Sequence, residues 1–218
     1  HTWSLSVEEQ FYLVFPIITF LIINKFSKNT FLLILIIISV LSLIIAEYYS
    51  RLSLENIFFL TQFRIFELSI GVGCSFFDYY HPKKLNMFFK TFPKLTKSFS
   101  LISLLLIILS FFLLNNNSSL PGFLSLWPTI PVAIFILTIR EFKGLLIIFN
   151  YKFFIIMGKM SYSLYLWHLP LIVFFPFFLK DFNLIFYFLV LIIISFISWK
   201  FIELPVRNKN YKSKNVFL

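Results

Sequence analysis

The stretch FLLILIIISVLSLIIA, residues 31–46, decides the fold of this chain. It contains no charged side chain, and its only polar residues are serines. A run of this kind is a candidate membrane-spanning helix, because about 20 apolar residues in a helix cross the hydrocarbon core of a bilayer. Of the 218 residues, 60% are hydrophobic and only 13% are charged, whereas about a quarter of a soluble domain is charged. The sequence therefore predicts a membrane protein without an additional large soluble domain.

Further apolar runs, bounded by charged or turn residues, predict an all-α, polytopic transmembrane helical bundle of about seven spans. The predicted spans are residues 11–23, 31–46, 57–77, 99–114, 123–139, 161–179 and 182–202. The apolar segment 144–158 carries Asn150 and Lys152 at its middle. We therefore expect it to lie at the membrane interface as a helix that does not span.

Basic residues are concentrated in every second connection between the predicted spans. Sixteen of the 19 lysines and arginines follow the first, third and fifth predicted spans or end the chain, and only Arg51 and Lys180 lie in the other connections. Because lysine and arginine accumulate in cytoplasmic loops, the amino-terminal end is predicted to face outward and the carboxyl end to be cytoplasmic. Topology thus accounts for the net charge of +10, and no nucleic-acid partner is expected.

The first polar constellation lies in WSLSVEEQFY, residues 3–12. Ser6 and Glu9 have the spacing of a capping box at a helix start, which would explain the acids structurally. Ser4, Glu8 and Tyr12 recur every four residues, so on a helix they line one face that could bind a polar ligand at the membrane surface. Both interpretations stay open at this stage.

The second constellation is TQFRIFELSIGVG, residues 61–73. Arg64 and Glu67 are three positions apart, so on a helix they share a face and can pair. We place them about two turns into the third span, where a charged group faces a bundle interior or a water-filled cavity. The alternative is a structural ion pair between helices. Gly71 and Gly73 fit close helix packing.

The third constellation is GKMSYSLYLWHLP, residues 158–170, which opens the sixth span. His168 lies near the middle of that span, and Tyr165 and Ser161 precede it on roughly the same face. This arrangement favours a role in a polar cavity, against the alternative of a packing histidine.

The fourth constellation, FIELPVRN, closes the last span. Glu203 and Arg207 are spaced for an i, i+4 pair, although Pro205 argues against a continuous helix between them. Cys74 is the single cysteine. No metal-ligand cluster, nucleophile elbow or glycine-rich phosphate loop is present, so neither a metal nor a bound cofactor is expected.

Taken in order, WSLSVEEQFY, FRIFELSIG, GKMSYSLYLWHLP and FIELPVR resemble the membrane-bound acyltransferase family 3, which includes lipopolysaccharide and exopolysaccharide O-acetyltransferases. The resemblance covers nearly the whole chain. It implies transfer of an acyl group, usually acetyl, from acyl-CoA to a hydroxyl of an envelope glycan or lipid-linked sugar at the bacterial inner membrane. It also implies catalytic roles for Arg64, Glu67, His168 and Glu8. It further implies functional positions for Trp3, Ser4 and Glu9, which we assign to substrate binding together with Tyr12 and Tyr165, the tyrosines that share helix faces with Glu8 and His168.

The family's proposed catalytic histidine lies on the first span, upstream of the WSLSVEEQFY stretch with which this chain opens. Residues 1–207 are accordingly interpreted as the C-terminal part of a membrane acyltransferase domain that lacks about three amino-terminal spans, with 208–218 as a cytoplasmic basic tail. The fragment alone is expected to be inactive. Two other hypotheses are a transporter or flippase fragment, because Arg–Glu pairs and a mid-span histidine also serve transport pathways, and a truncated, inactive acyltransferase.

Overall fold

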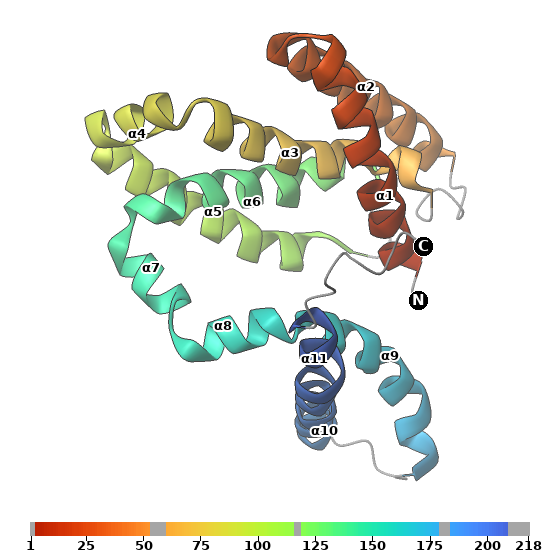
Figure 1. The fold of residues 1–218 in the computed structure, drawn as a ribbon. Coiled ribbons are helices and arrows are strands. Elements are labelled where there is room, and N and C mark those ends of the chain that lie inside the picture. Colours follow the sequence, from red (N-terminus) through yellow and green to blue (C-terminus); the bar gives the residue numbers. More distant parts are fainter. Residues whose placement is uncertain (1–2, 53–59, 116–118, 179–183, 209–218) are drawn as a thin grey trace, which may run out of the picture. The chain divides into compact units, whose positions relative to one another are not determined.

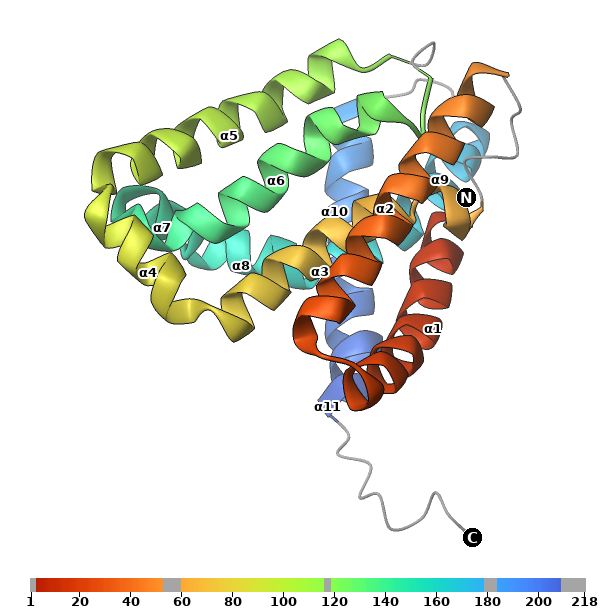
Figure 2. The same cartoon turned by 90° about the horizontal axis from the view of Figure 1, so that it is seen from above.

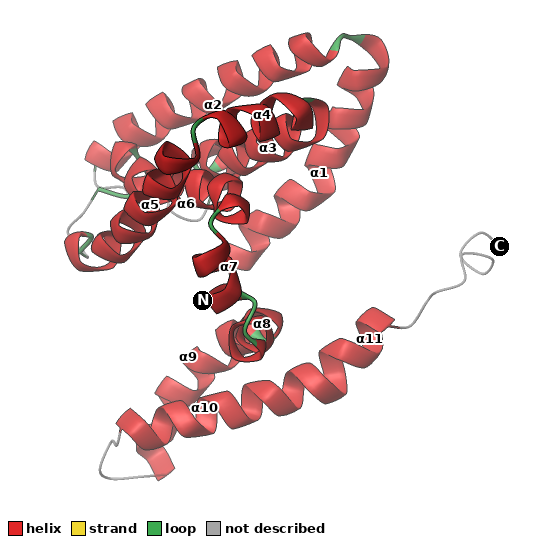
Figure 3. Ribbon diagram, turned by 90° about the vertical axis from the view of Figure 1, so that its left-hand side faces the viewer, coloured by secondary structure: helices red, strands yellow, loops and turns green. Residues whose placement is uncertain are grey.

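The computed structural model describes residues 3–52, 60–115, 119–178 and 184–208. Every regular element in these ranges is a helix (Figure 3), so the prediction of an all-α protein is confirmed. The chain divides into two compact units, Thr2–Leu146 and Ile147–Leu218 (Figure 1). Each unit is described by itself.

The first unit contains six α-helices among its described residues: α1 (Trp3–Lys25), α2 (Lys28–Arg51), α3 (Ile65–Tyr80), α4 (Pro82–Thr91), α5 (Pro93–Leu113) and α6 (Leu126–Thr138). Short 3-10 helices join them: η2 (Thr61–Phe63), η3 (Phe123–Ser125) and η4 (Ile139–Glu141). The division between the units falls within α7 (Lys143–Phe149). The second unit continues with α8 (Lys152–Lys159), α9 (Ser161–Phe178), α10 (Leu184–Ser198), the π-helix η5 (Trp199–Glu203) and α11 (Leu204–Asn208).

Five helical stretches in the described ranges are long and apolar enough to cross a membrane: Leu5–Lys25, Lys28–Arg51, Pro93–Leu113, Phe123–Glu141 and Leu184–Arg207. They correspond to five of the predicted spans. The other two predicted spans contain α3, with 16 residues, and α9, with 18 residues. The predicted number of about seven is therefore approximate.

Two segments depart from the boundaries expected from hydropathy. The third span was expected to begin at residue 57, but its helix α3 begins at Ile65, after a turn at Arg64; residues 57–59 lie outside the described ranges. The predicted interfacial helix 144–158 is two short helices, α7 and α8, which are separated at Asn150 and Tyr151. Neither helix is long enough to span a bilayer. Of the predicted basic tail 208–218, only Asn208 falls within the described ranges.

Small hydroxyl side chains, and not large apolar ones, fill the buried face of α5. Its buried residues are Thr96, Ser100, Ser103 and Ser110, while neighbouring residues such as Phe111 are strongly exposed. This arrangement is typical of membrane helices, where small residues let two helices approach and apolar side chains face lipid. Here α5 packs on α6, α6 on α3 and α3 on α2 (Figure 2).

Contacts between helix ends agree with the predicted alternation of sides within the first unit. Arg140 and Asp78, both predicted to be cytoplasmic, form a bidentate ion pair with distances of 2.9 and 2.7 Å. At the opposite ends, the Phe123 backbone N–H donates to the Glu47 carboxylate at 2.9 Å, and both residues are predicted to face outward. The contacts fix which ends lie together; the assignment of the cytoplasmic side stays a prediction.

Candidate functional site

Arg64 and Glu67 form the predicted ion pair, with Arg64 Nε 3.0 Å from Glu67 Oε2. The side chains are 25% and 16% exposed, so the pair is largely shielded within the protein. The predicted position two turns into a span is wrong, because Arg64 is the residue immediately before α3. Glu67 consequently lies in the first turn of α3, where the positive end of the helix dipole stabilises its carboxylate.

A turn between η2 and α3 sets this position. The Ser42 hydroxyl on α2 donates to the Gln62 carbonyl at 2.7 Å, and the Arg64 backbone N–H donates to the Thr61 carbonyl at 2.9 Å. These bonds satisfy backbone groups that a continuous helix would have paired internally. The apolar pattern of the sequence gives no sign of this break.

The Arg64–Glu67 pair lines a cavity of about 250 Å³ between α3 and the segment that leads into α6. The other lining residues are Leu114, Leu120, Pro121, Ser125, Pro128 and Thr129. Two of them are hydroxyl residues, and the Thr129 hydroxyl donates to the Ser125 carbonyl at 2.9 Å. The cavity thus combines a guanidinium, a carboxylate and two hydroxyl groups with apolar side chains, which is a set of groups that can stabilise the charge of a polar reaction.

Glu47 holds the wall of this cavity in place, a role that the sequence analysis missed. Its carboxylate accepts hydrogen bonds from the Phe123 backbone N–H at 2.9 Å and from Arg51 Nε at 2.8 Å. Gly122 approaches the same carboxylate so closely that a Cβ at this position would lie 2.5 Å from Glu47 Oε2. The available signals were the i, i+4 spacing of Glu47 and Arg51 and the Pro-Gly pair that precedes the fifth span.

A hydrogen bond of Gln10 connects the first motif to the second. Gln10 was not among the predicted site residues. The Thr61 hydroxyl donates to Gln10 Oε1, which joins α1 to η2. Glu8, Glu9 and Tyr12 are exposed, so the described contacts do not bring them into the Arg64 cavity.

Trp3 and Ser4 lie in the first turn of α1, and their side chains are outside the described part of the structure. The capping-box interpretation of the first motif is wrong, because α1 begins at Trp3 and Ser6 is already inside the helix. The Ser6 hydroxyl instead accepts a hydrogen bond from Gln10 Nε2 at 3.4 Å.

The glycines of the second motif are not needed for close packing. A Cβ built at Gly71 or Gly73 meets nothing within 4 Å among the described side chains. Close packing at these two glycines is therefore not seen among the described residues.

His168 and Tyr165 belong to the second unit, on α9. His168 Nδ1 lies 2.6 Å from the Tyr165 carbonyl oxygen, and the two rings are 5.4 Å apart between centroids. Because a carbonyl only accepts hydrogen bonds, this contact assigns the proton of a neutral imidazole to Nδ1. The Tyr187 hydroxyl on α10 donates to the His168 carbonyl at 3.0 Å, which fixes the backbone of α9 at this point.

The last motif keeps its predicted ion pair, with Arg207 Nη1 3.3 Å from Glu203 Oε1. Pro205 does not interrupt the helix, contrary to expectation, because the π-turn η5 leads directly into α11 and Pro205 is the second residue of that short helix. Pro205 therefore lies near the end of a continuous helical stretch, Leu184–Arg207, directly after a π-turn. Glu203 also accepts a hydrogen bond from the Ser163 hydroxyl at 3.2 Å, which joins this motif to α9.

No group of three or more His, Cys, Asp or Glu residues that could hold a metal ion occurs in the part of the chain that the structure describes. Cys74, the single cysteine, is half-buried in α3, and its Sγ is 3.9 Å from the Ala133 carbonyl oxygen. The residues that line the Arg64 cavity can supply hydrogen bonds and stabilise charge.

Comparison with known proteins identifies consistent relatives. The family model Acyl_transf_3, described as an acyltransferase domain, matches residues 1–202. The O-acetyltransferase OatA of Staphylococcus aureus strain NCTC 8325 is 28% identical over 227 residues, which cover 98% of this chain and 37% of the relative. A putative O-acetyltransferase of Staphylococcus aureus strain COL is 31% identical over 229 residues, covering 99% of this chain and 37% of the relative. This chain spans little more than a third of the length of these relatives, and no solved structure matches it significantly.

Proposed function

Because the chain belongs to the Acyl_transf_3 family of acyltransferases, we propose that it forms part of an enzyme that transfers an acetyl group from acetyl-CoA to a hydroxyl of an envelope glycan. The observation that carries the proposal is the shielded Arg64–Glu67 pair at a cavity inside a membrane helix unit. The printed names of the relatives, which are O-acetyltransferases, support the choice of the acetyl group and of an oxygen acceptor.

The proposed reaction begins when an acceptor hydroxyl attacks the carbonyl carbon of the thioester and a base takes up the hydroxyl proton. The carbonyl oxygen then carries the negative charge of a tetrahedral intermediate. Collapse of this intermediate breaks the C–S bond, forms the acetyl ester and releases CoA, which takes up a proton at sulfur. A fixed positive charge near the oxyanion accelerates this chemistry, and removal of one such donor typically costs about 100- to 1,000-fold in rate.

Arg64 is the proposed source of that positive charge. Glu67 holds the guanidinium by its Nε atom and so fixes the orientation of the planar group. Ser125 and Thr129, on the opposite wall, are proposed to contact the acceptor, because hydroxyl groups can both donate to and accept from a sugar.

The remaining sequence-predicted residues keep supporting roles in the proposal. Glu8 and His168 are proposed as secondary proton-handling groups, and the principal base is expected on the upstream spans that the family resemblance implies. The proposed substrate contacts outside the cavity are Trp3, Ser4, Glu9, Tyr12 and Tyr165. The enzyme is proposed to lie in the bacterial cytoplasmic membrane with its carboxyl end in the cytoplasm.

The test uses the complete enzyme, with this chain joined to an upstream membrane segment, expressed in membranes that contain the acceptor glycan. Incorporation of radiolabel from acetyl-CoA into base-labile glycan esters measures transfer. We expect Arg64→Lys to lower it by at least about 100-fold, because an ammonium group cannot reproduce the planar guanidinium fork.

Arg140→Lys is the matched control, because Arg140 forms its ion pair with Asp78 at an exposed position, where a pair contributes little. It should retain transfer and insert normally. Full transfer by a correctly inserted Arg64→Lys variant would disprove the assignment of Arg64. Transport of the glycan without acetylation by the parent enzyme would favour a transporter instead.

A further inference from the structure

A second cavity, of about 340 Å³, lies between α1, α2 and α3 on the opposite side of α3 from the Arg64–Glu67 pair. We define it as the α1–α3 slot. Its lining residues are Gln10, Phe11, Val14, Phe15, Ile18, Ile22, Phe31, Ile34, Leu35, Ile38, Thr61, Gln62, Ile65 and Ser69. Nothing in the proposed acyl transfer uses this space.

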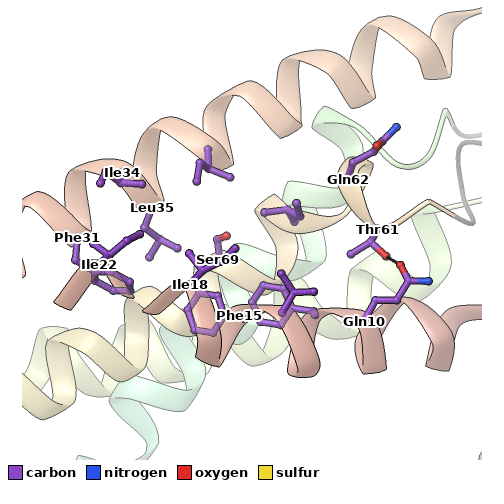
Figure 4. Close-up of a pocket in the computed structure, with 14 residues that line it drawn as sticks. Gln10, Phe15, Ile18, Ile22, Phe31, Ile34, Leu35, Thr61, Gln62 and Ser69 are labelled. Atoms are coloured by element: carbon purple, nitrogen blue, oxygen red, sulfur yellow. Dashed lines mark hydrogen bonds between the residues drawn. The ribbon is translucent and has the colours of Figure 1, made fainter. Parts of the chain in front are cut away.

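The shape of the slot fits a single chain. Along α1 it extends from Gln10 to Ile22 (Figure 4), a distance of about 18 Å at 1.5 Å per residue. A helix with its side chains is about 10 Å across, whereas the whole slot has a volume of about 340 Å³, so an extended chain suits this elongated space better than a helix does.

Polar groups follow a definite order along the slot. Gln10 and Thr61 lie hydrogen-bonded to one another at one end, Ile22 and Phe31 lie at the other, and Ser69 lies between the two ends (Figure 4). Ser69 is one helical turn beyond Ile65, or about 6 Å deeper along α3. The walls beyond it are hydrocarbon and aromatic side chains.

Ser69 itself needs a partner. It is only 3% exposed, and its hydroxyl has no hydrogen-bond partner among the described residues. A buried hydroxyl without a partner is destabilising, and such a group in a native structure calls for an explanation. The hydroxyl oxygen is covered in this structure, and Ser69 lines the slot, so rotation of this short side chain would let it donate to an acceptor oxygen on a molecule bound at this depth.

We propose that the α1–α3 slot binds one acyl chain of a glycerolipid, with the headgroup at the Gln10–Thr61 end. A glycerolipid has the same order of groups as the slot: a polar headgroup, then an ester carbonyl, then a hydrocarbon chain. Ser69 donates to the ester carbonyl, and the chain extends toward Ile22 and Phe31. The slot length of about 18 Å is close to the thickness of one leaflet, since the whole hydrocarbon core measures about 30 Å.

The experiment uses the purified complete enzyme in detergent and a radiolabelled diacyl phosphatidylglycerol, with its dialkyl ether analogue as the comparison probe. We expect saturable binding of about one diacyl lipid per enzyme. The ether analogue, which lacks the ester carbonyl, should bind about 2- to 10-fold more weakly, the effect of one hydrogen bond. Ser69→Ala should remove this difference without unfolding the protein, because it deletes only an unpartnered hydroxyl.

Two adjacent isoleucines of α2 provide the matched pair of blocking variants. Ile38 lines the slot and Ile37 does not, although both are partly exposed. Ile38→Trp should lower lipid binding by at least tenfold, and Ile37→Trp should leave it unchanged. Equal binding by both variants, or an ester-over-ether preference that survives in Ser69→Ala, would overturn the proposal, as would cross-links that show another protein segment occupying the slot.

Discussion

Arg64 and His168 are two polar groups that the sequence places within apolar spans, and the structure satisfies them differently. Arg64 lies at a break before α3, where Glu67 binds its Nε atom and a cavity adjoins the pair. His168 lies within the uninterrupted helix α9, and its Nδ1 atom contacts the Tyr165 carbonyl of that same helix. The first arrangement involves a change of backbone direction, and the second includes a contact within one helix together with the hydrogen bond from Tyr187 on α10.

The difference has a functional consequence. A group at a helix break is oriented by neighbouring elements, so its position is defined relative to a cavity formed by residues far apart in sequence. The ring of His168 contacts a carbonyl of its own helix, which is a local contact that does not by itself place the ring beside the Arg64 cavity. We therefore propose Arg64 as the principal charged group of the site and His168 as a secondary one, and the following predictions test this ranking.

The largest expected effect is seen with topology reporters. Reporters fused to connections on opposite sides of the membrane should give opposite signals. Reporters fused after Lys28, near Lys90 or at the carboxyl end should read cytoplasmic, and a reporter near Asn116 should read external, because basic residues gather in alternate connections. Paired fusions to green fluorescent protein and alkaline phosphatase measure this directly. An external signal near Lys90 would place the Arg64 end of α3 on the cytoplasmic side of the membrane and contradict the predicted topology.

Exchange of the two charges, Arg64→Glu with Glu67→Arg, should lower acetyl transfer by about 100-fold while membrane insertion is retained. The ion pair can re-form in reverse, but the guanidinium then starts from the first turn of α3 and no longer from the turn before it. Ester formation on the glycan is the measurement. Activity close to that of the parent would show that only the pairing matters and that the pair is structural.

His168→Ala should lower transfer by about tenfold, and His168→Gln, which can accept a hydrogen bond but not act as a base, should recover most of it. The physical reason is the ranking itself: the principal base is proposed to lie on the upstream spans, so Nε2 of His168, which is unprotonated when Nδ1 donates to the Tyr165 carbonyl, contributes mainly as a hydrogen-bond acceptor and only secondarily as a base. Both variants should be assayed across pH. Losses of 100-fold or more in both, the size expected for a general base, would reverse the ranking of the two residues.

Gly122→Ala should lower transfer by only about fivefold. Its Cβ would lie 2.5 Å from Glu47 Oε2, so the carboxylate must move away from the Phe123 N–H, at a cost of about 1 kcal/mol for one hydrogen bond. Gly71→Ala is the matched control, because a Cβ there meets nothing within 4 Å and alanine favours a helix interior. An equal loss in the two variants would mean that Glu47 does not position the cavity wall.

Local spacing allowed several features to be predicted from the sequence. The helical class, the approximate span positions and the ion pairs Arg64–Glu67 and Glu203–Arg207 all follow from hydropathy and from three- or four-residue separations. These predictions succeeded because a helix repeats every 3.6 residues and so fixes which near neighbours meet.

The predictions of where helices begin failed because they also relied on local patterns alone. The capping box at Ser6 and the continuous helix through Arg64 were inferred from local patterns, but the observed starts at Trp3 and Ile65 differ. At Arg64, hydrogen bonds from distant residues, such as Ser42 to Gln62, compensate for the broken helix. Hydropathy averaged over a window contains no information about such a partner.

The sequence by itself determined that this chain is a helical membrane protein with polar motifs at defined points, because apolar runs of this length are stable only in a bilayer and only with their backbone hydrogen bonds paired. The tertiary structure alone decided which motifs meet. It joined Gln10 to Thr61 and Glu47 to Phe123, and it placed cavities on two sides of α3. These contacts depend on the packing of helices whose residues are 51 and 76 positions apart, and no local periodicity fixes that packing.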